Sequence, residues 1–132
     1  MSLLIDELGT WLAAQGEGTV GTDLFKLVRP ASPAACVSLH ATGGFGRPTY
    51  GVRELPTVQV VARAATPNGA LAKAYSIYGR FPRKGGLTLG GLHAFTVEAM
   101  NSPVYTGEES ASTGTGHLAS FNLAFHLRRP SS

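Results

Sequence analysis

Apolar and polar residues alternate along the segment 118–128, near the C-terminal end of the chain. The apolar residues occupy every second position: Phe121, Leu123, Phe125 and Leu127. The positions between them include four polar residues: Ser120, Asn122, His126 and Arg128. Successive side chains of a β-strand point to opposite faces. The segment is therefore predicted to be a strand with one face in the core and the other in water or against a partner.

Helical spacing of apolar residues occurs in two segments, 2–15 and 66–78. In the first segment the apolar residues lie three and four positions apart: Leu4, Leu8, Trp11 and Leu12. In the second segment the expected buried side is made of Ala70, Leu71, Ala74 and either Ile77 or Tyr78. Each segment also has a residue that can cap its start and a glycine that can end it: Ser2 and Gly16, and Thr66 and Gly79. These signals predict two amphipathic helices.

Five further segments are predicted to be strands: residues 23–28, 34–39, 57–63, 87–89 and 92–100. A proline-containing turn separates the first two, which are expected to form a hairpin. The order α-β-β-β-α-β-β-β predicts an α+β fold, with a single mixed, mostly antiparallel sheet and two helices packed on one face. Residues 1–132 are predicted to form a single domain. Two long loops are expected, at residues 41–55 and 101–116.

Charged residues make up 14% of the chain, well below the usual value of about 25%. A surface with so few charges suggests that part of it is covered by copies of the chain or by a partner. The basic residues are scattered rather than gathered in the dense stripe of a nucleic-acid-binding protein. The single cysteine, Cys36, excludes an intrachain disulfide and is expected to be a small buried residue. No signal peptide or membrane span is recognisable, so we expect synthesis in a reducing cytoplasm.

Motifs that would indicate catalysis or cofactor binding are not found in the sequence. The glycine-rich segments 43–46 and 85–91 lack the spacing of phosphate-binding loops. The four histidines lack metal-ligand spacing, and no nucleophile elbow occurs. Glu108 and Glu109 are adjacent, so in an extended chain they point apart and make a poor acid–base couple. The chain is therefore predicted not to be an enzyme and to have no catalytic, cofactor-binding or metal-binding residues.

The segment 41–55 combines a cation with aromatic residues in a glycine-rich context. Such a composition occurs in proteins that bind single-stranded nucleic acid, and Arg and Tyr are also enriched in protein interfaces. We favour contact with a protein. The candidate partner-binding residues are those of this segment and a basic group that follows the second predicted helix: Arg47, Tyr50, Arg53, Arg80, Arg83 and Lys84.

Three parts of the chain together resemble a known family. The N-terminal helix Leu3–Gln15 is the first, and the strand Val58–Arg63 with the helix from Thr66 to Ile77 is the second. The third is the segment Ser102–Gly107 with Glu109, followed by Phe121–Phe125. In order and in motif, these parts resemble the small tail proteins of long-tailed, siphovirus-like bacteriophages, the minor capsid proteins that act as tail terminators.

The resemblance implies a structural virion protein that forms a hexameric ring. In this family the ring sits on the head-proximal end of the tail tube, stops its growth and joins it to the head. The implied partners are other copies of the chain, the tail tube protein and a head-completion or connector protein. No membrane is implied, and nucleic acid is contacted only if DNA passes through the ring. The protein would be made in the host cytoplasm.

The basic group after the second helix could then lie at the rim or in the lumen of the ring, or equally on an exposed face with a purely structural role. Two alternatives remain for the whole chain. It could be another head–tail connector or completion protein, or a small nucleic-acid or ligand-binding module that uses the loop around Arg47.

Overall fold

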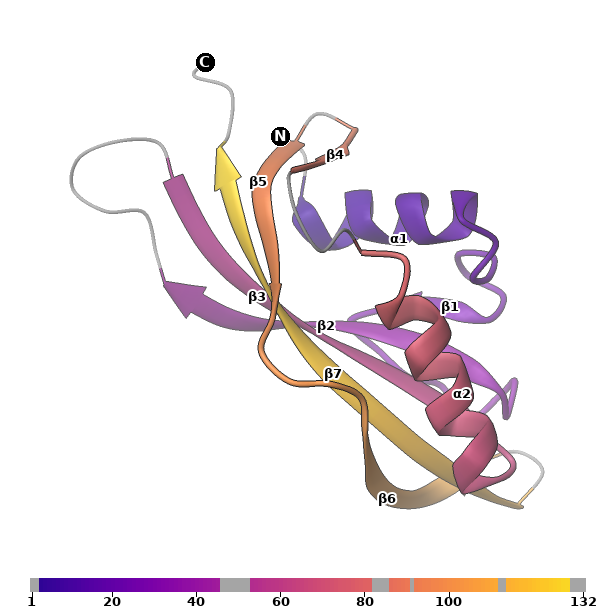
Figure 1. Ribbon diagram of the computed structural model, residues 1–132. Coiled ribbons are helices and arrows are strands. Elements are labelled where there is room, and N and C mark those ends of the chain that lie inside the picture. Colours follow the sequence, from indigo (N-terminus) through magenta and orange to yellow (C-terminus); the bar gives the residue numbers. More distant parts are fainter. Residues whose placement is uncertain (1–2, 46–52, 82–85, 91, 112–113, 129–132) are drawn as a thin grey trace.

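The computed structural model describes residues 3–45, 53–81, 86–90, 92–111 and 114–128 (Figure 1). The helices and strands follow one another as α1 (Leu4–Ala14), β1 (Leu24–Lys26), β2 (Cys36–Phe45), β3 (Arg53–Ala64), α2 (Pro67–Tyr78), β4 (Leu87–Leu89), β5 (Leu92–Ala99), β6 (Val104–Ala111) and β7 (Gly114–Arg128). The predicted α+β class is confirmed.

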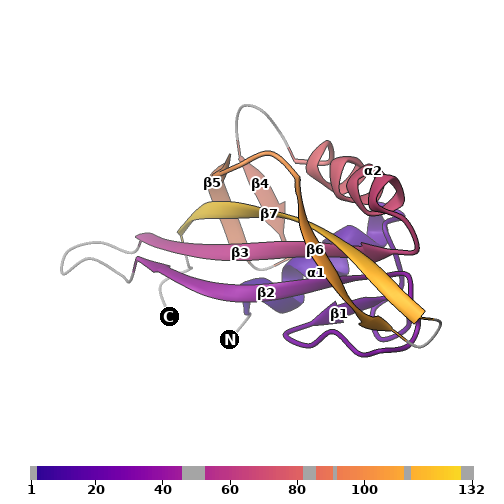
Figure 2. The ribbon, with the colours of Figure 1, turned by 90° about the horizontal axis from the view of Figure 1, so that it is seen from below.

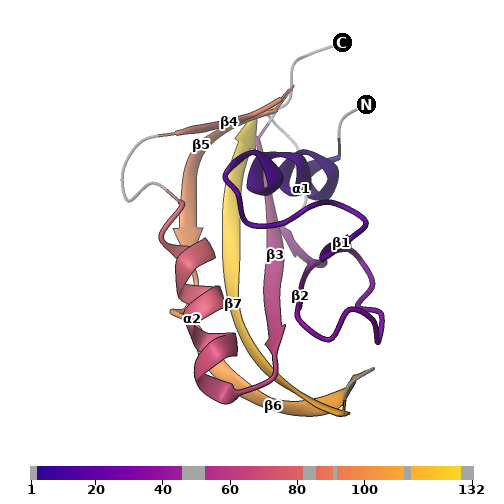
Figure 3. The same cartoon turned by 90° about the vertical axis from the view of Figure 1, so that its right-hand side faces the viewer.

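The strands form one seven-stranded sheet in the order β1-β2-β3-β7-β5-β4, with β6 pairing with β7. All the pairs are antiparallel except β1 with β2. The long strand β7 is central. One of its edges pairs with β3, and the other pairs with β6 in its first half and with β5 in its second half. Both helices lie on the same face of this sheet (Figure 3), α1 against β1, β2 and β4, and α2 against β3 and β7.

The core lies between the helices and this face of the sheet. The four alternating apolar residues of β7 are all buried, as predicted: Phe121, Leu123, Phe125 and Leu127. They pack in one cluster with the inward-facing residues of β3 and of both helices, among them Val58, Val60, Ala62, Leu8, Leu12, Ala74 and Ile77. Cys36 is also buried. The period-2 and helical patterns therefore assigned the core side of these elements correctly.

The helix-start signal at Thr66 is confirmed. The Thr66 hydroxyl oxygen accepts a hydrogen bond from the backbone N–H of Gly69 at 3.0 Å, and Pro67 is the first helical residue. In α1 the N-cap residue is Leu3, without a side-chain cap, and Ser2 lies outside the described residues. Gly16 follows the C-cap with φ of +84°, the left-handed conformation with which glycine ends helices.

The predicted hairpin at residues 23–39 is wrong, because β1 and β2 are parallel. Parallel neighbours need a connection that returns the chain to the same end of the sheet. The segment 27–35 makes this return. Its backbone N–H at Leu27 donates to the carbonyl of Leu39 at 2.7 Å, and the carbonyls of Pro30 and Pro33 accept hydrogen bonds from Arg63. These contacts hold the segment against β2 and β3.

The loop predicted at residues 101–116 is also wrong. Most of it is the strand β6 and the start of β7, which form a hairpin that extends beyond the helices (Figure 2). The first three residues of β6 are exposed and its later residues are at most partly buried, so its sequence lacks the apolar alternation of a core strand. The element order gains one strand and becomes α-β-β-β-α-β-β-β-β. The two ends of the other predicted loop are also strand, since β2 reaches Phe45 and β3 begins at Arg53, and residues 46–52 lie outside the described residues.

Candidate interaction surfaces

A cluster of charged side chains lies on the face of the sheet that the helices leave uncovered. It joins Arg29 from the segment after β1, Arg63 from β3 and Glu109 from β6, and we call these three residues the Glu109 clamp. Glu109 Oε1 accepts from Arg29 Nε at 2.6 Å and from Arg63 Nη1 at 2.7 Å. Glu109 Oε2 accepts from Arg29 Nη2 at 2.9 Å. One carboxylate thus links three segments that are far apart in the sequence.

The Arg63 side chain is almost completely buried, with 1% of its surface exposed. Its Nε donates to the carbonyl of Ala34 at 2.8 Å, and its Nη2 donates to the carbonyls of Pro33, at 2.9 Å, and of Pro30. Gly116 in β7 leaves room for this side chain, because a Cβ there would lie 2.5 Å from Arg63 Cδ. Within the described ranges, no buried side-chain nitrogen or oxygen lacks a partner. The guanidinium therefore fastens the segment 27–35 to the sheet.

The electrostatics of the clamp fix its charge state. Hydrogen bonds from Arg29, and secondarily from Arg63, lower the pKa of Glu109 from its ordinary value of 4.5 to about 2, against the effect of partial burial. The hydrogen bond to Glu109 raises the pKa of Arg29. The pKa of the neighbouring His40 is lowered by burial and by the charge of Arg29. A carboxylate held ionised by two cations is poorly suited to proton transfer at neutral pH, so the geometry supports a structural role.

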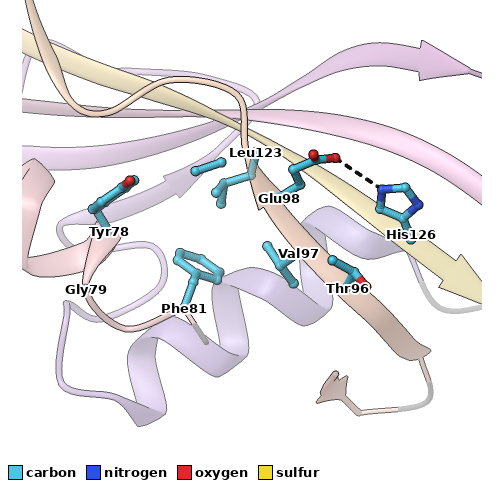
Figure 4. Close-up of a pocket in the computed structure, with 9 residues that line it drawn as sticks. Tyr78, Gly79, Phe81, Thr96, Val97, Glu98, Leu123 and His126 are labelled. Carbon is cyan, nitrogen blue, oxygen red and sulfur yellow. Dashed lines mark hydrogen bonds and ion pairs between the residues drawn. The ribbon is translucent and has the colours of Figure 1, made fainter. Parts of the chain in front are cut away.

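A groove of about 770 Å³ lies between the end of α2 and the strand β5. Its lining residues are Tyr78, Gly79, Phe81, Thr96, Val97, Glu98, Ala99, Leu123 and His126 (Figure 4). The apolar side chains among them are adjacent to the core, where the ring of Phe81 packs against that of Trp11 with the two ring centroids 5.1 Å apart. Glu98 and His126 form a polar rim, with Glu98 Oε2 3.4 Å from His126 Nε2.

The groove follows an open edge of the sheet. β4 pairs only with residues 92–94 of β5, and in the described part of the chain no strand pairs with the outer edge of residues 96–99. The backbone N–H of Met100 donates to the carbonyl of Asn122 in β7. Because backbone groups alternate between the two sides of a strand, those of Val97 and Ala99 face the open edge.

Of the six predicted partner-binding residues, two fall within the described residues. Arg80 is exposed and follows α2 between two lining residues of the groove, Gly79 and Phe81. Arg53 begins β3, where its backbone is paired with that of Arg128. The other four lie outside the described residues: Arg47, Tyr50, Arg83 and Lys84. The predicted set as a whole therefore stays a prediction.

The sequence reasoning missed the Glu109 clamp. One signal could have indicated it, because Arg63 follows the apolar run Val60-Val61-Ala62 inside a predicted strand, and a buried arginine needs a partner. Among the described residues, no group of three or more His, Cys, Asp or Glu side chains could hold a metal ion. No described helix is long and apolar enough to cross a membrane.

A model of one protein family matches most of the chain. No curated protein matches the chain. The model of a family described as bacteriophage tail terminator protein matches residues 11–127, which include every element except the first turns of α1 and the last residue of β7. This is the family that the sequence resemblance indicated, and it is a family of structural phage proteins. The chain belongs to the bacteriophage tail terminator family.

Proposed function

We propose that this protein forms a hexameric ring on the head-proximal end of the phage tail tube, stops the growth of the tube and provides the surface to which the head attaches. The observation that carries the proposal is the family match over residues 11–127. The arrangement of the side chains is consistent with it. Arg29, Arg63 and Glu109 are paired with one another in the Glu109 clamp, and the exposed apolar side chains Leu27 and Val28 follow the edge strand β1.

A closed ring requires a head-to-tail contact, in which two different surfaces of each copy meet. This chain has such surfaces, because the sheet ends in β1 on one side and in β5 and β4 on the other. The low content of charged residues, 14%, is consistent with burial of these ends. In solution we expect a mass of 13.7 kDa at low concentration and about six times that mass at high concentration. On the tail tube the ring should form more readily, since the tube acts as a template that raises the effective concentration of neighbouring copies.

The decisive experiment measures tube length. Purified tail tube protein is allowed to polymerise with and without this chain, and the lengths are measured by negative-stain electron microscopy. A terminator should stop elongation and appear as an annulus at one end of each tube. Unchanged lengths, together with binding to a head connector instead of the tube protein, would overturn the proposal in favour of a different head–tail joining protein.

We propose that the basic group Arg80, Arg83 and Lys84 faces a partner in this assembly. The exposure of Arg80 beside the groove supports this placement. Reversal of the three charges to Glu should impair tail completion while leaving the thermal unfolding midpoint unchanged. If the reversed protein completes tails normally, the group is an exposed face without a partner.

A further inference from the structure

Two large apolar side chains at one end of the sheet are held in water. Leu27 and Val28, which directly follow β1, have 58% and 60% of their surfaces exposed. We call this pair the apolar knob. Leu27 has φ of +70°, a left-handed conformation that residues with a branched side chain rarely adopt. Strained backbone of this kind persists where neighbouring contacts enforce it, and it occurs frequently at functional positions.

The contacts that enforce this conformation lie on both sides of the knob. The backbone N–H of Leu27 donates to the carbonyl of Leu39 in β2. Arg29, the next residue after the knob, makes the two hydrogen bonds to Glu109 and a third, of 3.3 Å, from its Nη1 to Ser38 Oγ. The knob is thus fixed before any partner arrives, which lowers the entropy cost of binding.

The strand β5, which lines the groove, lies on the other side of the sheet from β1, as the order β1-β2-β3-β7-β5-β4 requires (Figure 3). Phe81, Val97 and Leu123 give the groove an apolar part, and Glu98 and His126 give it a polar rim. Its volume is about 770 Å³, and it follows the open backbone edge at Val97 and Ala99. Two aliphatic side chains fit easily in a groove of this size.

We propose that the apolar knob of one copy docks in the β5 groove of the next copy and so forms the repeated joint of the ring. This inference rests on the proposed function and names the two surfaces that meet. A patch on one part of a molecule that fits a pocket elsewhere on the same molecule gives a head-to-tail contact.

The charges that flank the two surfaces are complementary. Glu98 on the rim of the groove has 66% of its side chain exposed beside His126, so its carboxylate can accept a further cation. Lys26 immediately precedes the knob, and its ammonium group lies 2.8 Å from Asp6 with about a third of its side chain exposed. In the proposed joint Lys26 of one copy faces Glu98 of the next.

The proposal is tested by a disulfide between copies. The variant with both V28C and A99C should form, under mild oxidation, a ladder of covalent oligomers that ends at the ring. Each single variant should form at most a small amount of dimer. Cys36 does not interfere, because it is buried and burial raises the pKa of its thiol. A matched control pairs A99C with L3C, since Leu3 is similarly exposed, at 50%, and should give no ladder.

A second measurement avoids engineered thiols. V28D should reduce the fraction of ring at a fixed concentration by at least about tenfold, because a charge would enter an apolar groove. V104D changes a residue of comparable exposure on β6 and should change that fraction less than about twofold.

A V28C dimer without a ladder would show a symmetric knob-to-knob contact and overturn the inference. A ring of the expected mass that forms equally well with V28D would overturn it as well, while leaving the proposed function intact. If the unmodified chain forms no ring even on tail tubes, the proposed function itself fails.

Discussion

The two faces of the sheet are held by different kinds of interaction. On the helix-covered face, apolar side chains such as Phe121 and Phe125 are fully buried. On the other face, Arg63, Arg29 and Glu109 form a network of directed hydrogen bonds and ion pairs. Apolar burial is non-directional and depends on the area removed from water. A buried charge needs each of its partners. The first face is therefore stabilised by many apolar contacts that have no preferred direction, and the second face by a few directed bonds.

The two kinds of interaction also hold different parts of the molecule in place. The apolar face attaches both helices to the centre of the sheet. The Glu109 clamp instead fastens two parts on the other face of the sheet, namely the segment 27–35 and the hairpin of β6 and β7. These parts bury little apolar surface of their own, so directed bonds replace packing. The proposed ring contact uses the knob at Leu27 and Val28, which depends on the clamp rather than on the apolar core.

The largest expected effect is on the apolar face. Phe121→Ala or Phe125→Ala should lower the free energy of unfolding by about 3–5 kcal/mol, because each leaves a cavity in a closed core. Chemical denaturation measures this change. Asn122→Ala is the control on the opposite side of β7, where the side-chain amide donates to Asn101 Oδ1 at 3.0 Å, and it should cost about 1 kcal/mol. Losses below about 1 kcal/mol in both Phe variants would contradict the assignment of this face.

Substitution of a single polar residue of the clamp should lower the free energy of unfolding by nearly as much. Arg63→Met removes four hydrogen-bond partners and leaves Glu109 with one cation, so we expect a loss of about 3 kcal/mol in the free energy of unfolding. The control is Lys26→Met, which breaks the more exposed ion pair of Lys26 with Asp6, 2.8 Å apart, and should cost less than about 1 kcal/mol. Similar losses in both variants would mean that the clamp stabilises the protein no more than an exposed ion pair does.

The clamp should also give the protein a distinct acid response. The folded-state pKa of Glu109 is depressed from 4.5 to about 2, so the stability that its ionised form provides is complete above pH 4.5 and is lost as the pH falls toward 2. Between these values Glu109→Gln should lose less stability than the parent protein. Parallel curves for the parent and Glu109→Gln would show that Glu109 is not strongly paired in solution.

Prediction from sequence succeeded where a pattern within one element carries the information. The alternation in β7 and the spacing in α2 assign their buried sides without reference to the rest of the chain. It failed where distant residues decide the structure. The segment 27–35 returns the chain because Arg63 binds its carbonyls, and β6 forms because its backbone pairs with β7 while Glu109 meets Arg29, 80 positions away. Neither contact leaves a periodic signal.

The same limit explains the candidate sites. Arg80 could be chosen as an exposed cation because the end of α2 was readable from Gly79. The knob could not be recognised, since Leu27 and Val28 continue the apolar run of a strand in the sequence and would be expected to point inward or to pair. Only the left-handed turn at Leu27 directs them to solvent.

The smallest expected effect tests whether a directed bond is costly only when it is buried. The cap from Thr66 to Gly69 lies on the helix side of the sheet but is exposed, so water can replace it. Thr66→Ala should therefore lower the free energy of unfolding by about 1 kcal/mol, well below the loss from Arg63→Met. Thr66→Ser keeps the hydroxyl and should cost only a few tenths of a kcal/mol. If Thr66→Ala were as damaging as Arg63→Met in urea denaturation, burial would not explain the strength of the clamp, and the contrast between the two faces would fail.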